Sequence, residues 1–459
     1  MNKTMDTYAN LICEQYTSRP VPEILEYYRE HGDLIKRSER KIRTIGMYYH
    51  GLHMGGVEKV ITLLIPIWQQ AGYQVVMLTQ EEPASADLAL PEETVRVVLP
   101  KDVQGFDKRL NAFEDALLTY GIDLVVYNEW GDYKTFHEML LVKRHHIPFI
   151  LYTHGAFSKI YAFLHDYSIH SHEIFGLCDK VLTLSEINRQ YYELCGCDSL
   201  LVQNPIEEKL KGTVPEYSGE SCHDVVWIGR FSEEKRPLDA IRVMQYVCMQ
   251  VPDAMLHFVG TGTEAMVGRA RALSRELGIE RNVIFCGQQS DVSRFYKEAA
   301  VVLMTSEAEG YPNVIIEAKA YGKVLAMYAL PYLTMTKSGL GLRTVRVGDV
   351  KGLAAEIVTV LTDADLRRKL EQESLQSFAE FRDYNQAELW NGIVKEMEQA
   401  DVCNTLCATG DGPLMISMLL DDVNIAYKRG QKAMEAYPDF RIGHAVLKIP
   451  RMIKHLLKL

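Results

Sequence analysis

Two glutamates, Glu309 and Glu317, stand eight positions apart where the sequence changes from strand-like to helix-like. They follow the apolar run Val301–Ser306. Gly310 and Pro312 break any continuous helix, and proline suits the first helical position, so the first glutamate is expected on a loop and the second inside a helix. The free N–H groups of a helix start favour a phosphate. The segment therefore has the outline of a sugar-nucleotide site.

Three further clusters are expected on loops that follow strands. The pair Gly55-Gly56 opens a helix after the first strand, where backbone without Cβ can approach a diphosphate. Arg230 and Lys235 precede a helix in the second half and could clamp a diphosphate. A glycine turn at Gly260 ends another strand. Each signal is weak alone, because glycine turns and solvated cations are common, but their co-occurrence is informative.

Alternating strand-like and helix-like segments position these loops. The first series has strands at 42–49, 74–79, 123–127, 149–153 and 180–184 and helices at 57–71 and 107–120. The second has strands at 224–228, 254–259, 282–285, 301–304 and 324–327 and helices at 237–250, 264–277, 313–321 and 350–361. Such alternation predicts an α/β fold with a helix-covered parallel sheet in each half. Ligands of such sheets bind outside the carboxyl ends of the strands, so two facing sheets would make a deep cleft.

Length and composition fit two domains. The chain of 459 residues is too long for one ordinary core, and its hydrophobic content of 47% is enough for two. We expect a helical extension at 1–40, a Rossmann-like domain at 41–205, a second at 206–382, a crossover helix at 383–400 and a C-terminal extension at 401–459.

The net charge limits which kinds of partner the protein can bind, and the cysteine spacing indicates the cellular compartment. Fifty Lys and Arg against 61 Asp and Glu give a net charge of −11, so general attraction to nucleic acid has no support. The nine cysteines match neither a disulfide framework nor a zinc pattern, which indicates a reducing cytoplasm. No secretory h-region or run of about 18 apolar residues is present, so we expect neither standard secretion nor a membrane span.

The end of the chain, 440–459, forms a basic amphipathic pattern interrupted by Pro450. Such a helix can lie on an anionic membrane surface, which for a cytoplasmic protein is the inner face of the membrane, or it can dock on its own protein. Both interpretations stay open.

Together the motifs resemble family 4 of the retaining glycosyltransferases, over about residues 41–400. The motifs are Gly55-Gly56-Val57-Glu58, Gly229-Arg230 with Lys235, Phe258-Val-Gly-Thr-Gly262, Asn282-Val-Ile-Phe-Cys-Gly287 and Ser306-Glu-Ala-Glu-Gly310-Tyr-Pro-Asn313 with Glu317. The resemblance implies the GT-B fold, in which two Rossmann-like domains face each other across a deep interdomain cleft.

The resemblance also implies roles for single residues. Arg230 and Lys235 would bind the donor diphosphate, Glu309 the transferred sugar, and Glu317 the ribose hydroxyls. His154, at the end of a strand of the first domain, matches a histidine that reaches the donor sugar. Further substrate contacts are implied for Gly55, Gly56, Gly260, Gly310, Tyr311, Pro312 and Asn313. After Lys323 the chain departs from the family pattern, which leaves the sugar specificity open.

The implied reaction is transfer from a nucleoside diphosphate sugar to a glycan or lipid-linked acceptor, with retention, in cell-envelope polysaccharide or glycoconjugate synthesis. UDP, GDP and ADP donors all fit. Cations and helix-end amides could stabilise the departing diphosphate, so no metal cofactor is expected. The only Asp-x-Asp, Asp363-Ala-Asp365, is better interpreted as a helix cap.

Two alternatives remain: a catalytically silent GT-B partner subunit, and a nucleotide-sugar epimerase or phosphorylase on the same fold. An NAD dehydrogenase is disfavoured because no G-x-G-x-x-G opens the first strand–helix turn.

Overall fold

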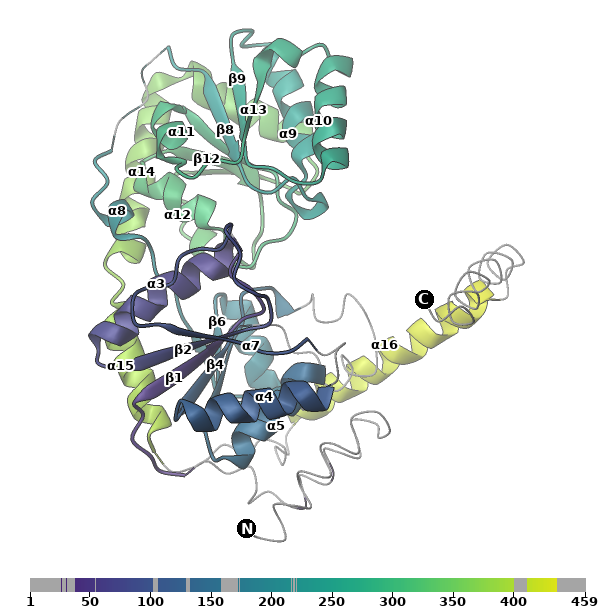
Figure 1. The fold of residues 1–459 in the computed structure, drawn as a ribbon. Helices are drawn as coiled ribbons and strands as arrows, with labels where there is room; N and C mark the ends of the chain where they lie inside the picture. The colour runs from purple at the N-terminus through teal and green to yellow at the C-terminus, as the bar shows by residue number, and fades with distance from the viewer. Residues whose placement is uncertain are drawn as a thin grey trace, which may run out of the picture.

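The computed structural model describes residues 38–435, together with residues 26 and 30, apart from residues 54, 102–105, 129–132, 158–171, 173, 216, 218, 220 and 400–410. Within this part of the chain, two helix-covered parallel sheets form two domains, one above the other in Figure 1. The predicted α/β fold with two Rossmann-like domains is confirmed. Nearly all of the extension expected at 1–40, and the whole amphipathic helix expected at 440–459, lie outside the described residues.

The first domain contains a seven-stranded sheet in the order β3-β2-β1-β4-β5-β6-β7. Its strands are β1 (Thr44–Tyr48), β2 (Gln74–Thr79), β3 (Val95–Val98), β4 (Leu124–Tyr127), β5 (Phe149–Tyr152), β6 (Lys180–Thr183) and β7 (Ser199–Leu201). Its helices are α3 (Gly56–Gln70), α4 (Phe106–Thr119), α5 (Tyr133–Arg144) and α7 (Glu186–Leu194). Helices cover both faces of the sheet, which explains why the central strands are continuous apolar runs.

The second domain contains a six-stranded sheet in the order β10-β9-β8-β11-β12-β13. Its strands are β8 (Asp224–Ile228), β9 (Met255–Val259), β10 (Val283–Gly287), β11 (Val301–Met304), β12 (Val324–Tyr328) and β13 (Leu342–Val345). Its helices include α9 (Pro237–Cys248), α10 (Glu264–Glu276), α11 (Ser293–Glu298), α12 (Asn313–Ala320), α13 (Val350–Thr362) and α14 (Ala364–Arg382). The short helix α8 (Glu208–Lys211) precedes this domain, and α15 (Gln386–Met397) follows it.

In both sheets the strand order reverses beside the first strand, between β1 and β4 and between β8 and β11. Ligands of doubly wound sheets bind at such a switch point, outside the carboxyl ends of the strands. The loops that follow these four strands carry most of the candidate site residues.

The chain passes between the domains twice, first just before α8 and again after α14 (Figure 1). On its return, α15 packs Trp390 against Trp68 of α3, with ring centroids 4.7 Å apart. The two passages touch each other, because the side-chain amide of Gln386 donates a hydrogen bond of 2.7 Å to the carbonyl oxygen of Gln203.

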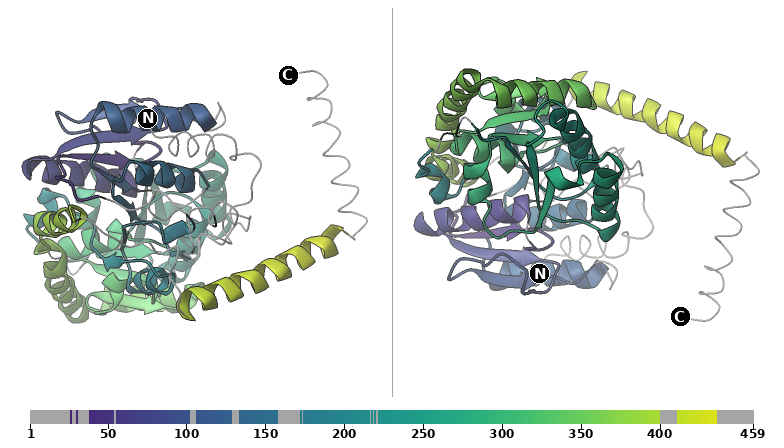
Figure 2. Two further views of the ribbon diagram at one scale, coloured as in Figure 1. Left: turned by 90° about the horizontal axis from the view of Figure 1, so that it is seen from below. Right: turned by 90° about the horizontal axis from the view of Figure 1, so that it is seen from above.

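A long helix, α16 (Asp411–Glu435), extends away from the body of the molecule (Figures 1 and 2). Ile416 and Leu420 pack into the core of the first domain, whereas Leu414 and Met418 are exposed. Among the helices that the structure describes, none combines the length and the apolar character that crossing a membrane requires.

Candidate active site

Lys235 and Glu309 meet at the switch point of the second sheet. Lys235 lies on the loop after β8 and Glu309 on the loop after β11, and these strands are neighbours. The Nζ atom of Lys235 is 2.5 Å from Oε1 of Glu309, and both side chains are largely withdrawn from solvent. The ammonium group can attract an anion, and the carboxylate can accept hydrogen bonds from hydroxyl groups.

The position of Lys235 depends on Thr305, the fully buried residue that follows β11. The hydroxyl oxygen of Thr305 lies 2.9 Å from the carbonyl oxygen of Lys235 and 3.0 Å from that of Arg236. It also accepts a hydrogen bond of 3.0 Å from the indole N–H of Trp227. Arg236 has a φ of 48°, in the left-handed region, so the chain turns sharply before α9 begins. The sheet interior thus fixes the loop that carries the cation.

Glu309 is held through its backbone. Its N–H donates a hydrogen bond of 2.8 Å to the hydroxyl of Tyr332, on the loop after β12. The next residue, Gly310, lies against the first domain: a Cβ added there would be 1.8 Å from the carbonyl oxygen of His154. The structure therefore brings Glu309, Gly310 and His154 together. Tyr332 escaped the sequence-based prediction because it lies where the chain departs from the family pattern and no motif marks it.

His154 follows β5 and is oriented by Asn128, which follows β4. The Nε2 atom of His154 is 3.0 Å from Oδ1 of Asn128, and the amide of Asn128 donates to the carbonyl oxygen of Tyr48 at 3.2 Å. We therefore assign the proton to Nε2. Burial lowers the pKa of His154 to about 3, so the ring is neutral near neutral pH. Its Nδ1 atom is suited to accept a hydrogen bond from a hydroxyl group.

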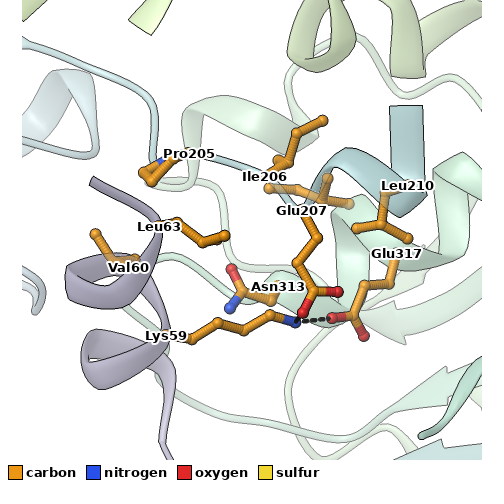
Figure 3. A pocket seen from close by; sticks show the side chains of 10 residues that line it. Lys59, Val60, Leu63, Pro205, Ile206, Glu207, Leu210, Asn313 and Glu317 are labelled. Atoms are coloured by element: carbon orange, nitrogen blue, oxygen red, sulfur yellow. Dashed lines mark hydrogen bonds and ion pairs between the residues drawn. The ribbon is translucent and has the colours of Figure 1, made fainter. Parts of the chain in front are cut away.

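Glu317 lies inside α12 and is buried, with 8% of its surface exposed. Its Oε2 atom accepts a hydrogen bond of 2.7 Å from the hydroxyl of Tyr296. Its Oε1 atom lies 3.1 Å from Nζ of Lys59, on α3 of the first domain (Figure 3). Lys59 Nζ is also 3.5 Å from Oε1 of Glu207. The predicted ribose-binding glutamate is therefore part of an ion pair between the domains, which no sequence motif indicated.

A small pocket of about 10 Å³ adjoins this ion pair (Figure 3). It is lined by Lys59, Val60, Leu63, Pro205, Ile206, Glu207, Leu210, Asn313, Ile316 and Glu317. Its residues come from both domains and from the first passage between them.

Arg230 stands apart from Lys235. Its side chain is 77% exposed, and its charged neighbour is Glu234, at 3.5 Å. In the part of the chain that the structure describes, Arg230 contacts neither member of the pair Lys235–Glu309. The Arg230 loop rests on the glycine turn: Gly260 has a φ of 129°, and a Cβ there would be 2.0 Å from the carbonyl oxygen of Gly229. The position of Gly260 thus supports the loop through its backbone.

The glycine pair opens α3 as predicted, with Gly55 as the N-cap and Gly56 as the first helical residue. A Cβ at Gly55 would be 2.4 Å from Oε2 of Glu58, whereas Gly56 has open space around it. Burial raises the pKa of Glu58, and the positive charges of His50 and Arg230 oppose this rise. The charge of Arg230, on a loop of the second domain, thus acts on Glu58 beside the glycine pair of the first.

The segment that joins Glu309 to Glu317 also connects the domains. The ring of Tyr311 packs against apolar clusters of both domains. Helix α12 begins at Asn313, as predicted, with Pro312 as an N-cap that makes no side-chain hydrogen bond, and it ends at Ala320, one residue earlier than predicted. Helix ends commonly differ by one residue between descriptions. The N–H of Ile315 donates to the carbonyl oxygen of Pro312, so the N–H groups of Asn313 and Val314 are the ones that could meet an anion.

The Asp-x-Asp sequence caps a helix. The side chain of Asp363 accepts a hydrogen bond of 2.9 Å from the N–H of Leu366, at the start of α14. This confirms the predicted cap. Among the described residues, no group of three or more His, Cys, Asp and Glu side chains is arranged to hold a metal ion.

Each domain matches a known family model. The model described as Glycosyltransferase Family 4 matches residues 54–209, and that described as Glycosyl transferases group 1 matches residues 220–376. The fold and the paired loops at the switch points agree with this assignment. The chain belongs to family 4 of the glycosyltransferases, which confirms the resemblance found in the sequence.

Relatives from bacteria are similar over part of their length. Lipopolysaccharide 1,6-galactosyltransferase of Salmonella typhimurium is 32% identical over 131 residues, which are 27% of this chain and 35% of that protein. N-acetyl-alpha-D-glucosaminyl L-malate synthase of Bacillus anthracis is 28% identical over 36% of this chain and 42% of that protein.

A longer match is the GalNAc-alpha-(1->4)-GalNAc-alpha-(1->3)-diNAcBac-PP-undecaprenol alpha-1,4-N-acetyl-D-galactosaminyltransferase of Campylobacter jejuni. It is 24% identical over 244 residues, 53% of this chain and 65% of that protein. The chain thus spans between 35% and 65% of the length of these three relatives.

Solved structures share the fold over most of the chain. Sucrose-phosphate synthase from Thermosynechococcus elongatus has a TM-score of 0.63 at 18% identity, covering 77% of this chain and 98% of that one. HepE of Anabaena, solved with UDP and glucose, has a TM-score of 0.62 at 16% identity, with the same two coverages, 77% and 98%. At these identities the likeness establishes the fold.

Proposed function

We propose that this protein transfers a sugar from a nucleoside diphosphate sugar to a glycan or lipid-linked acceptor, with retention of the anomeric configuration. The 2.5 Å contact between Lys235 and Glu309 carries the proposal. It places a cation suited to a departing diphosphate beside a carboxylate suited to the hydroxyl groups of the transferred sugar. The lipopolysaccharide and undecaprenol-linked substrates named for two relatives support an acceptor in cell-envelope glycan synthesis.

Charge separation defines the task of the site. As the bond between the anomeric carbon and the diphosphate breaks, positive charge grows on the carbon and negative charge on the leaving group. Lys235, Arg230 and the N–H groups at the start of α12 would stabilise the leaving group, each well-placed donor contributing about 3–4 kcal/mol. We propose that this preorganised potential makes a divalent metal unnecessary.

The acceptor hydroxyl would bond to the anomeric carbon on the face from which the diphosphate leaves and pass its proton to the departing phosphate oxygen. Glu309 would position the sugar through its hydroxyl groups. Neutral His154 would accept a hydrogen bond from another sugar hydroxyl at Nδ1.

A ligand screen followed by product analysis tests the proposal. One of UDP, GDP or ADP, or the corresponding nucleoside diphosphate sugar, should raise the melting temperature of the protein, because a ligand that binds only the native state stabilises it. The matching donor should yield a product with the donor's anomeric configuration, and a chelator should leave the rate unchanged. Absence of nucleotide release from every donor at long times would instead favour a silent partner subunit, and rapid loss of activity with chelator would contradict the metal-free proposal.

We further propose that residues 440–459, which lie outside the described residues, bring the protein to the cytoplasmic face of the membrane. Truncation after Asp439 should abolish binding to vesicles that contain anionic lipid. Equal binding by the full and the truncated chain would contradict this.

A further inference from the structure

Lys59 crosses from the first domain to a buried carboxylate of the second. It follows the glycine pair on α3, and its Nζ atom is 3.1 Å from Oε1 of Glu317 and 3.5 Å from Oε1 of Glu207. The three charged groups point toward one another in Figure 3. On the other side of the carboxylate, Tyr296 donates its hydroxyl hydrogen to Oε2 of Glu317 at 2.7 Å. Each oxygen of Glu317 therefore has one partner.

We propose that Lys59 is a positioning residue for the ribose of the donor nucleotide, because together with Tyr296 it fixes the carboxylate of Glu317 in the orientation that the ribose hydroxyls need. This inference rests on the proposed function, in which Glu317 binds the ribose. It adds a residue of the opposite domain to the nucleotide site.

The hydrogen-bonding capacity of the carboxylate supports this arrangement. An ionised carboxylate offers about four acceptor sites on its two oxygens. Lys59 and Tyr296 occupy one site on each oxygen of Glu317. One site on each oxygen is left, which suits two adjacent hydroxyl groups of a ribose.

The small pocket argues that Lys59 stays in place when a nucleotide binds. Its volume of about 10 Å³ is room for about one water molecule and is far too small for a ribose. The ribose would therefore approach Glu317 from another side, leaving the ion pair with Lys59 intact. Since Lys59 and Glu317 belong to different domains, the ribose site is complete only when the domains meet.

A merely structural ion pair between the domains makes a different prediction. Loss of such an ion pair would change how stably the two domains pack against each other and would weaken the binding of every nucleotide equally. A positioning role instead changes how well the site distinguishes a ribonucleotide from its 2′-deoxy counterpart. This ratio of dissociation constants is the informative measurement.

The experiment compares UDP, GDP and ADP with their 2′-deoxy forms by calorimetry on the full chain. The preferred ribonucleotide should bind the wild type at least about tenfold more tightly than its deoxy form, as expected for a hydrogen bond to a charged group. Lys59→Met should bring this ratio close to one, Lys59→Arg should preserve most of it, and Tyr296→Phe should lower it.

Lys209→Met is the matched control. Lys209 pairs with the same Glu207, at 3.1 Å, but is more exposed, so its loss removes an equal charge from the same neighbourhood. It should leave the ratio at the wild-type value. If Lys59→Met fails to fold, as melting curves would show, Lys59→Arg and Tyr296→Phe still measure the ratio.

The outcomes separate the two proposals. A wild-type ratio near one, or an unchanged ratio in Lys59→Met and Tyr296→Phe, overturns the positioning role and leaves the transferase proposal standing. A wild-type chain that binds none of the nucleoside diphosphates overturns the proposed function, and the positioning role with it.

Discussion

Gly310 lies so close to His154 that a Cβ at this position would come within 1.8 Å of the carbonyl oxygen of His154. The contact joins the loop after β11 in the second domain to the end of β5 in the first. At this contact the two domains touch each other next to Glu309. Any side chain at position 310 must therefore hold the domains apart or displace the loop.

Gly310→Ala should reduce kcat/KM for sugar transfer by about a hundredfold, because displacing reacting groups by about 1 Å can cost this much. The melting temperature of the second domain should change little. Gly268→Ala is the control, since this exposed position in α10 has open space around the glycine. Wild-type transfer by Gly310→Ala would show that the close contact is not needed for catalysis.

Glu309→Gln and Lys235→Ala should each lower kcat by at least about a hundredfold, the effect of removing one preorganised charged group. Lys235→Ala should also weaken nucleoside diphosphate binding, whereas Glu309→Gln should leave the melting temperature near the wild-type value. Steady-state kinetics and calorimetry measure these effects. Transfer at the wild-type rate in both variants would refute the assignment of the site.

Arg230→Ala should separate binding from stability. The side chain is 77% exposed, and its ion-pair partner among the described residues is Glu234, at 3.5 Å, so the unfolding free energy of the variant should lie within about 0.5 kcal/mol of the wild-type value. Nucleoside diphosphate should bind about tenfold more weakly, as expected when a charged hydrogen bond is lost. Denaturant titration and calorimetry provide the two numbers, and unchanged affinity would remove Arg230 from the diphosphate site.

His154 should make the fold sensitive to acid. Burial lowers its pKa from 6.5 to about 3, so below pH 6.5 the unfolded chain takes up a proton that the folded chain does not. Stability should therefore fall between pH 6.5 and pH 3, by about 2 kcal/mol at pH 5. In His154→Gln, the difference in unfolding free energy between pH 7.5 and pH 5 should shrink by about this amount. Urea titrations at both pH values test this, and an equal acid loss in both proteins would contradict the low pKa.

Apart from β10, a partly buried edge strand, the strands that sequence patterns predicted lie inside the sheets and are largely buried. The bounds of β2, β8 and β11 agree with the prediction to the residue, because their apolar runs end sharply at polar or glycine residues. The strands β3, β7 and β13 were missed. All three lie at sheet edges and are only partly buried, so their sequences lack the long apolar run that marks a central strand.

The sequence predicted those parts of the site in which residues follow the ends of neighbouring strands, because the order of the strands then determines which residues meet. Lys235 and Glu309 meet because their strands are adjacent. Lys59 and Glu317 are 258 positions apart, and their contact depends on how two domains pack, which no local pattern encodes. For the same reason the predicted clamp of Arg230 with Lys235 could not be checked from spacing, and the structure keeps Arg230 at the surface.

The hydrogen bond between Gln386 and Gln203 has a mechanical consequence. The two segments that join the domains are thereby fastened to each other. A change in the angle between the domains would have to move both segments together or break this hydrogen bond, so the two crossings act as one connection.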